Sequence, residues 1–138
     1  MGKLAVLIVD DSFLMRDIIK DSIKDAIPGV AVSLAGNGDE ARKKLTDMTF
    51  NLVLCDWEMP ELNGNELLKW LREDSSQKTI PFIMITAKGD RDSILEVMKL
   101  GVTDYIVKPF SPEVLCQKVL AVLKKSGWSE PRRPGGLI

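Results

Sequence analysis

The segment Leu4–Asp11, LAVLIVDD, indicates the fold class, because six apolar residues run directly into two aspartates. A continuous aliphatic run of this length is typical of a strand that is buried on both faces of a sheet. The two aspartates then stand where the strand ends. We therefore predict a buried strand over residues 4–9 with a pair of carboxylates at its carboxyl end.

Apolar runs and helix-period segments alternate through the rest of the chain. Strands are predicted at residues 4–9, 30–35, 50–55, 82–86 and 104–107. Helices are predicted at residues 13–27, 38–48, 64–73, 92–100 and 112–125. Five strand–helix repeats predict an α/β fold, a doubly wound, five-stranded parallel sheet with right-handed crossovers and helices on both faces.

Apolar side chains at helical spacing are assigned to the core. The first helix is predicted from apolar residues at spacings of three to five, which are Phe13, Leu14, Ile18, Ile19, Ile23 and Ile27. The methionines interpreted as core fillers are Met15, Met48, Met84 and Met98.

Length and composition are those of one globular domain. The 138 residues are 45% hydrophobic and 28% charged, which suffices for a single core. We assign residues 1–125 to this domain and residues 126–138 to a flexible tail or linker stub. No apolar run approaches the ~20 residues that span a bilayer, and we find no signal peptide, so we expect a cytoplasmic protein without membrane contact.

The residue types exclude several kinds of chemistry. No histidine is present, which excludes Ser-His-Asp and Cys-His catalysis and a His-ligated metal. Cys55 and Cys116 lie in apolar runs, which indicates buried, reduced thiols. Residues 1–123 carry a net charge of −4, which argues against direct nucleic-acid binding by the folded body.

Polar residues follow the predicted strands. Asp10 and Asp11 end the first, Asp56 the third, Thr86 the fourth and Lys108 the fifth. Because open α/β sheets bind ligands at the carboxyl ends of their strands, we expect these side chains to meet at one edge. Two unit charges 4 Å apart repel by roughly 4 kcal/mol at an effective dielectric constant of 20, so three carboxylates there require a compensating cation.

Oxygen ligands without histidine or cysteine favour Mg²⁺ or Mn²⁺ as that cation. A carboxylate beside such a metal, facing a hydroxyl and an ammonium group, is suited to accept a phosphoryl group. The sequence therefore predicts a phosphoryl-accepting site at this edge of the sheet.

Five motifs together resemble the receiver domain of two-component response regulators, the CheY-like family, over residues 3–125. The motifs are Asp10-Asp11, Asp56-Trp57-Glu58-Met59-Pro60 with Gly64, Thr86-Ala87, Tyr105, and Lys108-Pro109-Phe110. The resemblance, rather than the alternation of elements, implies the flavodoxin-like strand order 2-1-3-4-5.

The resemblance also implies a ligand set for Mg²⁺. Asp56 would be the phosphoacceptor. Asp11 and Asp56 would ligate the metal directly, together with the backbone carbonyl of Glu58. Asp10 would act mainly through a water molecule.

Further roles follow from the same resemblance. Lys108, joined to Pro109 by a cis bond, would pair with the phosphoryl group, and Thr86 would donate its hydroxyl to a phosphoryl oxygen. Tyr105 would change rotamer in response. The added charge would bias a partner-binding surface built from the fourth helix, the fifth strand and the fifth helix.

Two positions beside the site depart from the chemotaxis pattern of the family. Glu58 and Lys88 are predicted to hang over its mouth and to form an ion pair that slows hydrolysis of the aspartyl phosphate. Two separately solvated side chains are the alternative. Trp57 is interpreted as a partly packed surface ring.

The favoured function is a binding module controlled by phosphorylation, and not a turnover enzyme. A sensor histidine kinase would act on it in trans, and its target would be a downstream protein or a missing output domain. The alternative is a metal-dependent phosphohydrolase with an aspartyl-phosphate intermediate. Homodimerisation on phosphorylation remains open, and the kinase and the target are not identified by the sequence.

Overall fold

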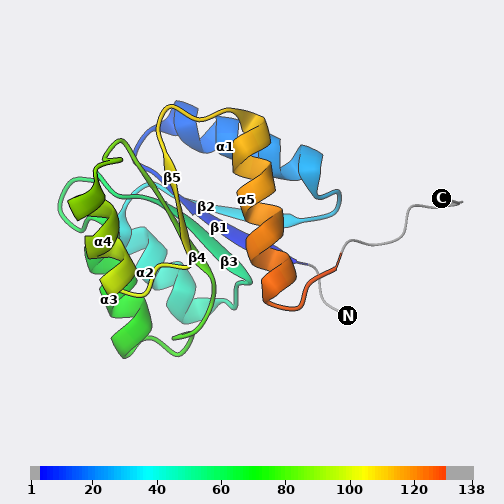
Figure 1. The fold of residues 1–138 in the computed structure, drawn as a ribbon. Helices are drawn as coiled ribbons and strands as arrows, with labels where there is room; N and C mark the ends of the chain where they lie inside the picture. Colours follow the sequence, from blue (N-terminus) through cyan, green and yellow to red (C-terminus); the bar gives the residue numbers. More distant parts are fainter. Residues whose placement is uncertain (1–3, 130–138) are drawn as a thin grey trace, which may run out of the picture.

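The computed structural model describes residues 4–129 and places five helices around one five-stranded parallel sheet (Figure 1). The strands are β1 (Ala5–Val9), β2 (Ala31–Ala35), β3 (Leu52–Asp56), β4 (Phe82–Thr86) and β5 (Asp104–Val107). The helices are α1 (Phe13–Ala26), α2 (Gly38–Asp47), α3 (Gly64–Asp74), α4 (Arg91–Lys99) and α5 (Pro112–Lys125). The strand order is β2-β1-β3-β4-β5 with every neighbouring pair parallel, which confirms the predicted fold class and order.

The helices cover both faces of the sheet, as predicted (Figure 1). α1 and α5 lie on one face, where their buried side chains pack against Val6 and Ile8. α2, α3 and α4 cover the other face, which presents Leu7 and Val9. Because successive strand residues point to opposite faces, the uninterrupted apolar run of β1 contributes to two cores at once.

Each helix begins at a residue whose side chain caps it. The five caps accept a hydrogen bond from the backbone N–H three residues further on; they are Ser12, Asn37, Asn63, Asp90 and Ser111. A cap of this kind stabilises a helix by ~1 kcal/mol. The caps therefore fix where each loop from the carboxyl edge of the sheet turns into a helix.

The third strand differs from its predicted range. β3 begins at Leu52 and includes Asp56, so Asp56 is the last residue of the strand and not the first residue after it. Phe50 lies outside because its backbone N–H donates to the side-chain Oε1 of Gln77, at 2.9 Å, and not to a neighbouring strand. The other elements depart from prediction only at their ends.

Three of the six apolar residues that predicted α1 are exposed, although the helix itself is confirmed. Phe13, Leu14 and Ile18 keep 72%, 69% and 43% of their surface exposed. The side chains that face the sheet are Ile19 and Ile23. At 3.6 residues per turn, the three exposed positions are rotated by ~100° or more from Ile19 and point away from the sheet.

Two of the predicted core methionines are also exposed. Met84 is fully buried on β4, but Met48 and Met98 lie at the ends of α2 and α4 with 47% and 56% of their surface exposed. Both cysteines are free thiols. Cys55 is buried, as predicted, whereas Cys116 is only partly buried.

Chain beyond α5 still contacts the core. The backbone N–H of Trp128 donates to the carbonyl of Leu123 at 3.0 Å, and its ring packs against the core on the α1 and α5 side. The division at residue 125 stays a prediction, since residues 130–138 of the predicted tail lie outside the described residues. Within residues 4–129, no helix combines the length and apolar character that crossing a bilayer requires.

Candidate functional site

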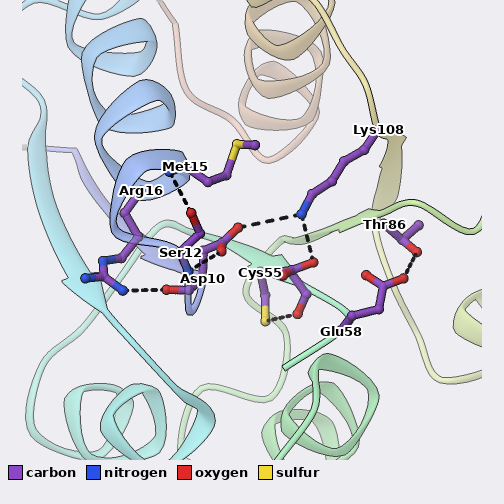
Figure 2. Close-up of polar contacts among 9 residues, drawn as sticks. Asp10, Ser12, Met15, Arg16, Cys55, Glu58, Thr86 and Lys108 are labelled. Atoms are coloured by element: carbon purple, nitrogen blue, oxygen red, sulfur yellow. Dashed lines mark hydrogen bonds and ion pairs between the residues drawn. The ribbon is translucent and has the colours of Figure 1, made fainter. Parts of the chain in front are cut away.

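Four polar side chains converge at the carboxyl edge of the sheet. Asp10 directly follows β1, and Lys108 directly follows β5. Asp56 and Thr86 are the last residues of the paired strands β3 and β4, whose register sets Asp56 opposite Ile85. Figure 2 shows Asp10 and Lys108 pointing toward each other across this edge. The structure thus brings together the side chains that the sequence placed at the strand ends.

Three carboxylates form a cluster at this edge. Asp10, Asp11 and Asp56 each offer one oxygen, and these oxygens lie within 4.8 Å of one another. Asp10 and Asp56 are buried, with 1% and 4% of their surface exposed, while Asp11 is exposed. Oδ1 of Asp10 accepts a hydrogen bond from the backbone N–H of Ser12 at 2.8 Å. Its buried Oδ2 has no hydrogen-bond donor among the described residues, which fits a ligand for a cation or its bound water.

Lys108 is the positive group that faces this cluster. Its Nζ lies 3.2 Å from Oδ1 of Asp56 and 3.8 Å from Oδ2 of Asp10. The backbone N–H of Lys108 donates to the carbonyl of Thr86 at 2.8 Å, which ties the loop after β5 to the end of β4. The Lys108–Pro109 peptide bond is cis, as predicted.

One ammonium group does not compensate the cluster. Burial, followed by the nearby charge of Asp10, raises the pKa of Asp56 from its ordinary 3.8 to about 6, although Lys108 partly opposes the shift. Burial likewise raises the pKa of Asp10, although the N–H of Ser12 and the charge of Lys108 lower it in part. The donor set is therefore short of positive charge, and a hard divalent cation fits it.

Thr86 is buried at the end of β4, and its hydroxyl makes two hydrogen bonds. The hydroxyl donates to Oε1 of Glu58 at 3.0 Å and accepts from the backbone N–H of Lys88 at 2.9 Å. Figure 2 shows the Glu58 carboxylate reaching Thr86 beside the cluster. Sequence reasoning placed Glu58 at the mouth of the site but missed this contact.

The predicted ion pair between Glu58 and Lys88 is wrong for this state of the protein. The Nζ of Lys88 lies 4.8 Å from the centre of the Trp57 ring, and the ion pairs found within residues 4–129 do not include Glu58. Glu58 accepts a hydrogen bond from the Thr86 hydroxyl, and the Lys88 ammonium lies over the Trp57 ring. Each of the two charged side chains therefore has a partner other than the other one. Trp57 is also buried, with 5% of its surface exposed, and is not the surface ring that we predicted.

Gly64 of the predicted motif allows α3 to begin close to the acceptor. A Cβ atom at Gly64 would lie 2.6 Å from the carbonyl oxygen of Asp56 and 2.9 Å from Cα of Trp57. Both distances are too short for a side chain without movement of the backbone. The glycine therefore fixes how the loop after β3 folds back over the strand end.

Two residues that hold the loop after β1 were missed from the sequence. Ser12 caps α1 and also binds Asp10 through its backbone N–H. Its position before a helical segment is an N-cap signal that was available. Arg16 donates from a guanidinium nitrogen to the carbonyl oxygen of Asp10 at 2.7 Å (Figure 2). No sequence pattern indicated this contact, because it depends on how α1 leaves the loop.

Tyr105 lies apart from the acidic cluster, half-buried on β5. Lys118 of α5 places its Nζ 5.0 Å from the centre of the Tyr105 ring and 3.2 Å from Oδ1 of Asp104. The ring position is therefore coupled to α5 through one lysine. This coupling was also missed, since it joins two elements that lie far apart in any local motif.

Comparison with known proteins assigns the chain to a family. The sequence model of the response regulator receiver domain matches residues 6–120. The chain belongs to this family. It is similar to the chemotaxis protein CheY1 of Helicobacter pylori, with 43% identity over 121 residues that cover 87% of this chain and 97% of that protein.

The chain is also similar to a transcriptional regulator and to a solved structure. The phosphate regulon transcriptional regulatory protein PhoB of Pseudomonas aeruginosa is 37% identical, and the alignment covers 100% of this chain but 60% of that protein. The solved structure of the chemotaxis response regulator CheY4 of Vibrio cholerae superposes with a TM-score of 0.81 at 33% identity, covering 88% of this chain and 99% of that one.

Membership of the family settles the general function. The chain is a receiver domain, a phosphorylation-dependent signalling switch of the kind found in CheY and PhoB response regulators. Receiver domains bind Mg²⁺ through an acidic pocket, and the aspartate cluster provides one. They interact with histidine kinases and downstream targets. The comparisons give no support to a metal-dependent phosphohydrolase.

Proposed function

We propose that Asp56 accepts a phosphoryl group from a sensor histidine kinase acting in trans. The observation that carries the proposal is the position of Asp56: a buried carboxylate between the Lys108 ammonium and the Asp10–Asp11 pair. This environment offers positive charge to the incoming phosphoryl oxygens on one side and a cation site on the other. This sequence contains no histidine, so the donor histidine has to come from outside it, in agreement with a kinase that acts in trans.

Asp11 and Asp56 are the proposed direct ligands of Mg²⁺, or of Mn²⁺, together with the backbone carbonyl of Glu58. Asp10 is proposed to hold a metal-bound water through its unpaired Oδ2. Two carboxylates with several remaining positions for water or phosphate suit Mg²⁺. When bound, the metal neutralises oxygens of the transferring phosphoryl group.

The chain's own residues supply the nucleophile and the orientation. Asp56, in its ionised form, attacks phosphorus; an Asp56 O–P bond forms as the bond from phosphorus to the donor nitrogen breaks, and the donor keeps that electron pair. Lys108 stabilises the charge on the phosphoryl oxygens, and Thr86 donates its hydroxyl to one of them. These roles agree with the places of the three residues at adjacent strand ends.

The output surface is proposed to be formed by α4, β5 and α5, with Tyr105 as the residue that changes rotamer. Leu95, Met98 and Val107 expose apolar surface on these elements, and this suits a protein partner. The partner is a separate downstream protein if the chain acts as its chemotaxis relatives do, or an output domain if it is part of a longer regulator. The folded body is mildly acidic, so we do not propose that it binds nucleic acid directly. Dimerisation on phosphorylation is an additional mode of output that this surface leaves open.

We place this function in the cytoplasm. The free thiols of Cys55 and Cys116 are typical of that reducing compartment. The module is proposed to signal by binding and not by turnover of a substrate, with Asp56, Thr86 and Lys108 acting on its own phosphoryl group.

The test is covalent phosphorylation by a small donor. The purified chain is incubated with Mg²⁺ and phosphoramidate and its intact mass is measured, with Asp56→Asn as the test variant and Asp47→Asn, an exposed aspartate at the end of α2, as the matched control. One phosphoryl group is expected on the wild type and on Asp47→Asn, and none on Asp56→Asn or in the presence of EDTA. A folded, Mg²⁺-binding wild type that gains no phosphoryl group would contradict the proposal.

A further inference from the structure

The hydroxyl of Thr86 has no hydrogen left for a phosphoryl group. A threonine hydroxyl carries one hydrogen, and here that hydrogen is donated to Oε1 of Glu58 at 3.0 Å. The oxygen already accepts from the backbone N–H of Lys88 at 2.9 Å, and 1% of Thr86 is exposed. Thr86 therefore has to leave Glu58 before it donates to anything on Asp56.

Glu58 is placed where a phosphoryl group would repel it. Asp56 and Thr86 are the last residues of paired strands, and Glu58 follows Asp56 by two positions with its carboxylate on the Thr86 hydroxyl. A phosphoryl group on Asp56 adds about −1.5 to −2 charges at neutral pH. Like charges repel, so the same event that requires the Thr86 hydroxyl also disfavours the Glu58 carboxylate on that hydroxyl.

Lys88 offers a new partner to the displaced carboxylate. Its backbone N–H donates to the Thr86 hydroxyl, so Lys88 lies next to the hydrogen bond between Thr86 and Glu58 that has to break. Its ammonium lies against the face of the Trp57 ring at 4.8 Å and forms no ion pair with a described residue. A single contact with an aromatic face is weak enough to be exchanged for an ion pair.

We propose that Glu58 is a positioning residue that holds Thr86 in the unphosphorylated state, and that phosphorylation exchanges partners among four side chains. Thr86 passes from Glu58 to a phosphoryl oxygen, Glu58 passes to Lys88, and Lys88 leaves Trp57. This inference rests on the proposed roles of Asp56 and Thr86. The hydrogen bond from Thr86 to Glu58 has to break each time the domain is phosphorylated, and this opposes the switched state. The switched state is therefore less populated than it would be with a neutral, short side chain at position 58.

The first experiment measures how tightly each variant binds beryllofluoride, a phosphoryl mimic, in the presence of Mg²⁺ by calorimetry. Glu58→Ala is expected to bind it more tightly than the wild type by on the order of tenfold, because the competing acceptor is gone. Glu58 is an exposed residue, so its truncation leaves the core intact, and Glu73→Ala, exposed near the end of α3, is the matched control with unchanged affinity.

A double-mutant cycle separates the hydrogen bond from plain charge repulsion. In a Thr86→Ala background, Glu58→Ala is expected to change the affinity by less than about twofold, because no hydroxyl remains to be released. If the tenfold gain persists without Thr86, the carboxylate acts through its charge alone and the proposal is overturned. Equal affinities of Glu58→Ala and the wild type overturn it as well.

A second cycle tests the exchange with Lys88. Lys88→Met is expected to weaken beryllofluoride binding several-fold in the wild type and by less than about twofold in Glu58→Ala, where no displaced carboxylate needs a partner. An equal loss in both backgrounds would show that Lys88 serves the phosphoryl mimic directly, against the proposed exchange. A wild type that fails to bind beryllofluoride with Mg²⁺ would instead contradict the receiver mechanism itself, so the two failures are distinguishable.

Discussion

The Nζ of Lys108 lies 3.2 Å from Oδ1 of Asp56 and joins the loop after β5 to the end of β3, two strands that are not neighbours in the sheet. The contact is held at 24% exposure of the lysine side chain, so it is only partly screened by water. It sets one ammonium group against a cluster of three carboxylates, and the pKa values of Asp10 and Asp56 stay raised despite it, chiefly through burial.

Replacing Lys108 should affect the rate of phosphorylation and the affinity for Mg²⁺ in opposite directions. We expect Lys108→Met to slow phosphorylation of Asp56 by phosphoramidate by on the order of 100-fold, since one donor to the phosphoryl oxygens is lost. The same change should tighten Mg²⁺ binding, because a competing cation leaves the acidic cluster. Rates are measured by intact mass and Mg²⁺ affinity by calorimetry, with Lys20→Met on α1 as the control for lost surface charge. Weaker Mg²⁺ binding in Lys108→Met would contradict this account.

The metal-free domain should be stabilised by neutralising Asp56. Its pKa is raised in the folded state to about 6, above the unfolded value near 3.8, so its contribution to stability is fully present below about pH 4 and is lost as the pH rises through about 6. At about pH 7.5, Asp56→Asn should therefore unfold at a higher urea concentration than the wild type, by about 1–3 kcal/mol in free energy. Below about pH 4 the two proteins should converge.

Magnesium should reverse this order. Binding to the folded state alone stabilises the wild type as the metal concentration rises, while Asp56→Asn, which lacks a proposed ligand, should gain less. Urea unfolding in EDTA and in excess Mg²⁺ gives both comparisons, with Asp47→Asn as the control. Should Asp56→Asn be the less stable protein in EDTA, the cluster is not under the electrostatic strain that we describe.

The positions of the residues at the strand ends were predictable from sequence, because a polar residue that directly follows a buried apolar strand lies at the carboxyl edge of a parallel sheet. Asp10, Thr86 and Lys108 all lie at the predicted edge for this reason. Contacts among side chains were not predictable in the same way. Glu58 was expected to choose Lys88 by charge, but a buried hydroxyl on the neighbouring strand is its partner. Spacing within one segment carries no information about such neighbours.

Burial of individual apolar residues was predictable only on strands that are covered on both faces of the sheet. β1 and β3 are fully covered, so their runs are buried almost throughout. On a helix, spacings of three to five admit more than one stripe, and the choice depends on how the helix is set on the sheet. The sequence therefore predicted the helix correctly without showing that Phe13 and Leu14 would be exposed.

Gly64→Ala should disturb the acceptor although it adds one carbon. The new Cβ would meet the carbonyl of Asp56 at 2.6 Å, and that backbone atom has no freedom to move without shifting the strand end. We expect a loss of about 1–3 kcal/mol in unfolding free energy and slower phosphorylation. Gly29→Ala is the comparison, since its Cβ meets no atom within 4 Å and only its φ of +86° is strained. If the two variants were equally mild, the close approach at residue 64 would not be the reason for glycine.

Arg72 should matter for stability and not for phosphorylation. Its guanidinium donates to the carbonyls of Gly101, Lys78 and Ile80, at 2.9, 3.1 and 2.6 Å, so it joins the end of α3 to the segments before β4 and after α4. These contacts lie at the edge of the sheet opposite to Asp56. A lysine ammonium cannot reach all three carbonyls at once as the forked guanidinium does. Arg72→Lys should therefore lower the free energy of unfolding by about 1–3 kcal/mol, as measured by urea titration. Its rate of phosphorylation by phosphoramidate should stay that of the wild type, and a rate that falls with stability would mean that this edge is coupled to the acceptor.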